Sequence, residues 1–201
     1  KHYTDNQLTE VSKGLETFAI HEYEERKVAQ RFSIEGDNIY IDCSANEKSN
    51  FLKIGPDTTE FVNKTPFEFL QSGTQKPWEV DIDDTLDWQD IYDLLYISDN
   101  KHRSIIRAFM LCCFNPDIHY PILQIVGKKG SGKTTLAKFI KWIVDPSTSH
   151  PKQLPAKEDD MIASISNEHI TVFDNIRKLT SKQQDSLCRI STGETYAKRK
   201  L

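Results

Sequence analysis

The clearest chemical signal in this 201-residue sequence is a glycine-rich segment at residues 127–134. Its sequence, GKKGSGKT, matches the phosphate-binding pattern GxxxxGK[ST] at every fixed position. Glycines in such a loop let backbone N–H groups turn inward around a β-phosphate, and the N-terminus of the following helix adds the positive end of its dipole. The predicted binding residues are Gly127, Lys128, Lys129, Gly130, Ser131, Gly132, Lys133, Thr134 and Thr135.

Three side chains of this loop have specific predicted roles toward ATP and Mg²⁺. Lys133 supplies a cation to the β- and γ-phosphates, Thr134 offers its hydroxyl to Mg²⁺, and Thr135 reaches the α-phosphate. An apolar run at 120–126 predicts a buried strand before the loop, and apolar residues at helical spacing follow it. These flanks favour a P-loop over a glycine-rich turn that contains Lys-Thr by accident.

The second chemical signal is an acid at the end of another apolar run, residues 169–174. A P-loop needs a carboxylate on a neighbouring strand tip to hold the metal, and Asp174 is the predicted catalytic and metal-binding acid. The alternative is an ordinary acid in a turn after a strand. Asn175 stands where many P-loop ATPases carry a second acid that polarises water. We therefore expect slow hydrolysis, in which either Asn175 orients water without deprotonating it or a base comes from elsewhere.

The periodicity of apolar residues predicts the elements that position these residues. Residues 22–70 are predicted to form a small antiparallel β module after a helix at 7–20. Residues 71–77 form the predicted linker, so the expected domains are 1–77 and 78–201. Further helices are expected at residues 86–95, 99–114, 136–144, 159–167 and 181–190.

Composition excludes several classes of protein. Hydrophobic residues make up 37% and charged residues 28%, as in globular proteins. No apolar run is long enough to span a bilayer, and the N-terminus lacks the apolar core of a signal peptide, so we expect a cytoplasmic protein with no membrane partner. Four cysteines without a CxxC pair predict reduced thiols rather than a zinc site or disulfides. The first residue, Lys1, and the abrupt end predict a piece of a longer protein.

The net charge of −4 is unevenly distributed. Residues 1–100 carry a net charge of −12 and residues 101–201 carry +8. The basic half is the expected side for an anionic ligand, although scattered solvated charge is an open alternative. An acidic run at residues 79–90 is interpreted as solvated charge at a helix start, with metal binding as the alternative.

The C-terminal motifs resemble a known group of ATPases. The segment LCRISTGE at 187–194, followed by KRKL at 198–201, resembles the B′ motif of superfamily 3 helicases, including the helicase half of viral and phage primase-helicases. Together with GKKGSGKT and FDN, these motifs resemble P-loop ATPases of phages and integrated mobile elements. The resemblance covers about residues 85–201 and does not include the β module.

This resemblance implies an α/β fold: an AAA+-like P-loop NTPase with a parallel-sheet core, here preceded by the helix and antiparallel β module. It also implies a homo-oligomeric ring, a hexamer, that uses ATP with Mg²⁺. A basic hairpin would project into a channel holding single-stranded DNA, and by position its residues would be Lys198, Arg199 and Lys200. Three cations in a solvated chain end are the alternative. The family's sensor motif and arginine finger would lie beyond Leu201.

These observations lead to three functional hypotheses. The first is an ATP-driven DNA motor of the helicase or primase-helicase type, with a primase or other replication proteins as possible partners. The second is an ATP-gated assembly or defence-complex module with little hydrolysis, which Asn175 favours. The third is a small-molecule kinase, for which the sequence has no evident phosphate lid. Fold alone does not choose among them.

Overall fold

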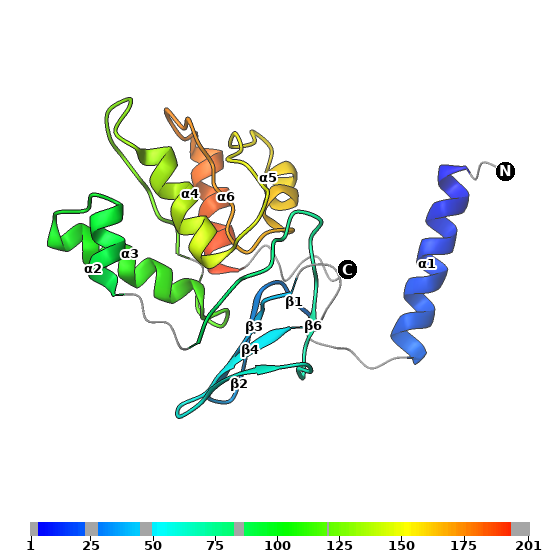
Figure 1. Cartoon of the computed structure of the whole chain (residues 1–201). Helices are drawn as coiled ribbons and strands as arrows, with labels where there is room; N and C mark the ends of the chain where they lie inside the picture. Colours follow the sequence, from blue (N-terminus) through cyan, green and yellow to red (C-terminus); the bar gives the residue numbers. More distant parts are fainter. Residues whose placement is uncertain (1–3, 23–27, 45–49, 83–86, 120, 194–201) are drawn as a thin grey trace.

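The computed structural model describes residues 4–22, 28–44, 50–82, 87–119 and 121–193 as a mixed α/β arrangement (Figure 1). In chain order the elements are α1 (Asp5–Glu22), β1 (Val28–Ala29), β2 (Phe32–Glu35), β3 (Asn38–Asp42), β4 (Phe51–Ile54), β5 (Thr59–Val62), β6 (Glu68–Phe69), α2 (Trp88–Leu94), α3 (Asn100–Cys113), α4 (Lys133–Val144), α5 (Glu158–Ile165) and α6 (Ser181–Thr192).

The predicted β module is confirmed as an antiparallel sheet of four strands in the order β2-β3-β4-β5. β2 and β3 form a hairpin in which Ile34 pairs with Ile39. Gly36 in the turn has φ +57°, a conformation that glycine adopts without strain. A short parallel pairing of β1 with β6, which the sequence pattern did not predict, joins the two ends of the module.

The predicted helices are confirmed, and local capping explains where several begin. Asp87 and Asp99 precede α2 and α3, and each side chain accepts hydrogen bonds from backbone N–H groups of the first turn. Thr180 and Gln183 form a capping box at the start of α6, and Gly193 ends that helix in a left-handed conformation.

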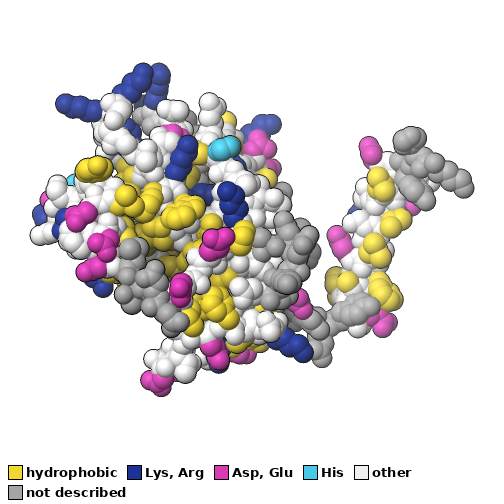
Figure 2. Space-filling view, in the orientation of Figure 1, with side chains coloured by type: hydrophobic (Ala, Val, Ile, Leu, Met, Phe, Trp, Pro, Cys, Tyr) yellow, Lys and Arg dark blue, Asp and Glu magenta, His cyan; other side chains and the backbone are white. Residues whose placement is uncertain are grey.

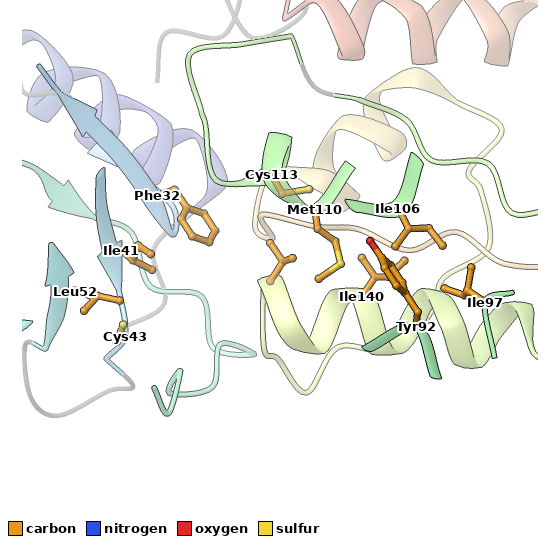
Figure 3. Close-up of a cluster of buried hydrophobic side chains, with 11 residues drawn as sticks. Phe32, Ile41, Cys43, Leu52, Tyr92, Ile97, Ile106, Met110, Cys113 and Ile140 are labelled. Carbon is orange, nitrogen blue, oxygen red and sulfur yellow. The ribbon is translucent and has the colours of Figure 1, made fainter. Parts of the chain in front are cut away.

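One hydrophobic cluster extends from the β module into the helices (Figure 3). Phe32 and Ile41 of the sheet belong to the same cluster as Met110 of α3 and Ile140 of α4. The two predicted domains, 1–77 and 78–201, therefore share one hydrophobic core.

The predicted linker, residues 71–77, is held to both sides of this boundary. Lys76 N–H donates to Pro146 O at 2.9 Å, and Gln75 forms an antiparallel bridge with Ser147. The Gln75 side chain also donates to the buried carboxylate of Asp42 at 3.0 Å. Residues 71–77 therefore pack against both parts of the chain and do not form a flexible linker.

The prediction of strands before the phosphate loop and before Asp174 is wrong for residues 121–126 and 169–174. Residues 121–126 form no strand; Ile122 and Val126 are 56% and 81% exposed. Residues 169–174 show one parallel bridge, Lys152 with Phe173. A parallel strand needs hydrogen-bonded neighbours. Among the described residues, only the segment around Lys152 forms a β-bridge with residues 169–174. Tyr120 lies outside the described residues.

Other predictions have mixed outcomes. The cysteines are free thiols; Cys113 is buried, but Cys112 is half-buried. Trp142 on α4 is 63% exposed. α1 has no buried residue, and its hydrophobic side chains are visible beside the rest of the chain in Figure 2. Among the described helices, none has the length and apolar character needed to cross a membrane.

Candidate functional site

The phosphate loop leads directly into α4, which begins at Lys133. Gly130 and Gly132 have φ of +81° and +77°, in the left-handed region that side-chain-bearing residues rarely adopt. Gly132 is the N-cap of α4 and has no side chain to occupy the free N–H groups of the first turn. These N–H groups could therefore donate hydrogen bonds to an anion.

The loop folds around the carbonyl of Lys128. Lys133 Nζ donates to Lys128 O at 2.6 Å, and Ser131 Oγ donates to the same oxygen at 2.9 Å. A Cβ at Gly127 would lie only 2.7 Å from Ser131 Oγ, so this position requires glycine for space rather than for backbone conformation. Lys129 and Thr135 are exposed beside this arrangement.

The most informative contact joins the loop helix to the predicted acid. Thr134 Oγ1 donates to Asp174 Oδ2 at 2.8 Å, across 40 residues of sequence. Asn175 N–H donates to Asp174 Oδ1 at 2.7 Å, and Asn175 has φ +59°. Asp174 N–H in turn donates to Lys152 O at 2.9 Å. Both carboxylate oxygens and the backbone of Asp174 are thus held in place.

These donors also set the charge of the acid. The Thr134 hydroxyl, followed by the Asn175 N–H, lowers the pKa of Asp174 below its usual value of 3.8, and the Lys133 ammonium adds to this effect. Asp174 is therefore ionised at neutral pH.

A hydroxyl and a carboxylate beside a cationic loop fit Mg²⁺ with a phosphorylated ligand. Mg²⁺ prefers oxygen ligands and is commonly held by one or two carboxylates, substrate phosphates and water. Within the described residues, His, Cys, Asp and Glu side chains form no cluster of three or more that suits a metal ion. Thr134 and Asp174 would therefore hold Mg²⁺ together with ligand phosphates and water, not in an all-protein cage.

A buried ionic network, which sequence analysis missed, lies at the other end of α4. Lys141 Nζ donates to Asp145 Oδ2 at 3.1 Å and to Glu168 Oε2 at 3.0 Å. Arg31, 1% exposed, contacts Asp145 Oδ1 through Nε at 3.3 Å. Lys152 also pairs with Glu168. The sequence does contain a signal for a buried charge here, because Lys141 lies at helical spacing from the apolar residues Ala137 and Val144.

The network keeps its acids ionised despite burial. Burial raises the pKa of Asp145, but the Lys141 ammonium, the Ile170 N–H and the Arg31 guanidinium together hold it below 3.8. Burial likewise raises the pKa of Glu168, while bonds from Lys152 and Ser149 and the Lys141 charge bring it below 4.5. The network is a set of paired charges at neutral pH.

His169 is a half-buried packing residue in the segment that leads to Asp174. Its ring lies 4.5 Å from the Phe32 ring, and its Nε2 is 2.7 Å from Cys113 O. Burial lowers the pKa of His169 below 6.5. The neutral ring donates from Nε2 to the carbonyl, so His169 connects the Asp174 segment to the core.

A polar groove lies apart from the phosphate loop, between residues 70–74 and 166–168. It shares no residue with the loop or with Asp174. The predicted DNA-binding residues Lys198, Arg199 and Lys200 lie outside the described residues.

Comparison with known proteins gives one family. Residues 89–201 match the family described as actinomycete integrative conjugative element replication protein. The match covers more than half of the chain and includes the phosphate loop and Asp174, but not the β module. No curated protein and no solved structure matches the chain.

Proposed function

The chain belongs to the replication proteins of actinomycete integrative conjugative elements, and on that premise we propose that it is an ATP-binding P-loop ATPase. It would be the motor part of a DNA helicase or primase-helicase of a mobile element. The contact of Thr134 with Asp174 at 2.8 Å is the observation that carries this proposal. This contact places the hydroxyl of Thr134, the last residue of the GxxxxGK[ST] pattern, beside the Asp174 carboxylate, which is 40 residues away in sequence. A Mg-ATP site requires such a pair.

Each residue has a role in this proposal. Backbone N–H groups at 130–133 would bind the β-phosphate, and Lys133, which here donates to Lys128 O, would neutralise the β- and γ-phosphates. Thr134 and Asp174 would hold Mg²⁺, which would neutralise charge that develops on the phosphate oxygens. Asn175 lies beside Asp174 and orients a water molecule.

The finer features of the proposal come from the resemblance to superfamily 3 helicases. They comprise an AAA+-like core, a hexameric ring, and translocation along single-stranded DNA gripped by Lys198, Arg199 and Lys200. In such a ring an arginine from a neighbouring subunit accelerates hydrolysis, by about 10³–10⁵-fold in other P-loop enzymes. Residues 1–201 alone should therefore bind ATP and hydrolyse it slowly.

A second candidate function is an ATP-gated assembly module with little turnover. The observation that favours it is Asn175, whose amide cannot take a proton from water and whose backbone is committed to Asp174 Oδ1 at 2.7 Å. Rapid DNA-stimulated hydrolysis would exclude this second function, whereas tight Mg-ATP binding without turnover in the assembled ring would favour it.

Calorimetric titration with ATP tests the nucleotide site. Lys133→Ala should abolish Mg-ATP binding while the thermal unfolding midpoint stays unchanged, because Lys133 contacts the loop and not the core. Asp174→Asn should lose the gain in affinity that Mg²⁺ provides. Lys157→Ala and Asp185→Asn, exposed positions elsewhere on the surface, are the matched controls. Unchanged Mg-ATP affinity in Lys133→Ala would overturn the proposal.

Fluorescence anisotropy with a single-stranded oligonucleotide tests the DNA-binding segment. Each phosphate contact contributes a slope of about −0.7 to log affinity against log salt. Replacing Lys198, Arg199 and Lys200 by Ala should therefore reduce the slope by about two and weaken binding to all sequences equally. Superimposable salt series for wild type and triple variant would remove the DNA role from this segment.

A further inference from the structure

Helix α4 contacts the segment that carries Asp174 at two separate points. Near its N-terminus Thr134 donates to Asp174 Oδ2 at 2.8 Å. Near its C-terminus Lys141 Nζ donates to the carbonyl of Ile170, and Ile170 N–H donates to Asp145 Oδ2 at 3.0 Å. The helix and residues 170–174 therefore run in opposite directions and are joined at both ends.

The two contacts are separated by similar lengths of helix and of segment. Thr134 and Lys141 are seven residues apart, which is about two helical turns and about 10 Å along one helix face. Ile170 and Asp174 are four residues apart, or about 13 Å in extended backbone. A slip of one residue at Ile170 would move Asp174 by about 3.3 Å, beyond hydrogen-bond reach of Thr134.

The contact at Ile170 is part of the buried network. The Lys141 ammonium has three donors, and three acceptors receive them: Asp145 Oδ2, Glu168 Oε2 and the Ile170 carbonyl. Well-packed apolar residues can often replace such buried ion pairs without loss of stability. Stability alone therefore does not account for the network, whereas its directional bonds do specify the register of the Asp174 segment.

The β module participates through Arg31, which precedes β2. Its Nε contacts Asp145 Oδ1 at 3.3 Å, and its Nη2 donates to Pro146 O at 2.9 Å. Its Nη1 also donates to Asp42 O of β3 at 2.9 Å. Arg31 thus connects the sheet to the same carboxylate that holds Ile170.

We propose that Lys141, Asp145 and Arg31 are positioning residues that hold the Asp174 carboxylate against Thr134, which makes the N-terminal β module part of the Mg-nucleotide site. This inference rests on the proposed function. It assigns to the β module a role that neither the family match nor the sequence motifs include. Lys141, Asp145 and Arg31 touch neither nucleotide nor metal and act through Ile170 and the backbone to Asp174.

The test compares ATP affinity with Mg²⁺ and with EDTA for each protein. Lys141→Met should reduce the Mg²⁺-dependent gain in affinity by about tenfold or more, as loss of an outer-shell partner does in metal sites. Affinity in EDTA should stay within about twofold of wild type, because the loop is separate from Lys141. A defect that is merely structural would lower both affinities together.

Two further variants complete the test. Lys53→Met is the matched control, since it removes the pair of Lys53 with Glu60 on the surface of the β module. Lys141→Met combined with Glu168→Gln keeps Asp145 paired with the buried Arg31 and guards against unfolding of the single variant. It too should lose the Mg²⁺-dependent gain.

The outcomes separate this inference from the proposed function. If the wild-type protein does not bind Mg-ATP, the proposed function itself is refuted. If wild type binds Mg-ATP and the folded double variant keeps the full Mg²⁺-dependent gain, the positioning role alone is overturned. Unfolding of both Lys141 variants in circular dichroism would also overturn it, because the network would then serve stability.

Discussion

Gly127→Ala should weaken Mg-ATP binding because the added Cβ would clash with the Ser131 hydroxyl. Ser131→Ala should remove this clash. The new Cβ would lie 2.7 Å from Ser131 Oγ, closer than real Cβ contacts, and 3.6 Å from Lys133 Cδ, an ordinary contact. Ser131 Oγ must move, and its hydrogen bond to Lys128 O at 2.9 Å breaks. The clash is confined to this one hydroxyl oxygen.

The magnitude follows from the bond that is lost. A hydrogen bond of this kind contributes about 1 kcal/mol, which corresponds to about a fivefold loss of affinity if the loop must be restored for binding. In a Ser131→Ala background the nearest atoms are at 3.6 and 3.7 Å, so Gly127→Ala should then cost almost nothing. The double-mutant cycle should show a coupling of about 1 kcal/mol.

Calorimetric titration of the four proteins with Mg-ATP measures this coupling. Gly73→Ala is the matched control, because a Cβ there meets nothing within 4 Å and the backbone conformation is ordinary. An equal effect of Gly127→Ala in both backgrounds would refute the steric explanation, as would a Gly73→Ala effect of the same size.

Three more predictions concern backbone conformation, pH and packing. Gly132→Ala should weaken Mg-ATP binding by about 1–2 kcal/mol, measured by calorimetry, because φ is +77° although the space is open; Gly132→Asn should cost less. Burial lowers the pKa of His169 below 6.5, so the unfolded chain binds more protons than the folded chain as the pH falls through that value. The unfolding free energy should therefore be retained at neutral pH and fall as the pH decreases below 6.5. Urea denaturation should show a flatter profile for His169→Gln, and an unchanged profile would contradict this origin. Ile140→Ala should lower the unfolding free energy by about 2–5 kcal/mol in the same assay, because this 2%-exposed side chain joins helix and sheet in one core, whereas exposed Ile122→Ala should change it little.

Local physics explains what the sequence alone determined. Helix starts at Asp87, Asp99 and Thr180 depend on a side chain and N–H groups two or three residues away, so the sequence contains both partners. The β2–β3 hairpin depends on a turn at Gly36 and on adjacent apolar runs. The phosphate loop is likewise contiguous, and the glycines that its backbone needs are part of its pattern.

Only the tertiary structure decided which distant segments meet. The apolar runs at 120–126 and 169–174 had the composition of strands, but a strand requires hydrogen-bonded neighbours, which the sequence does not reveal. Asp174 was recognisable as a candidate acid, but its distance to Thr134 depends on how residues 168–174 lie along α4. Arg31 and Asp145 are 114 residues apart, and their contact exists only because one core packs the sheet against α4.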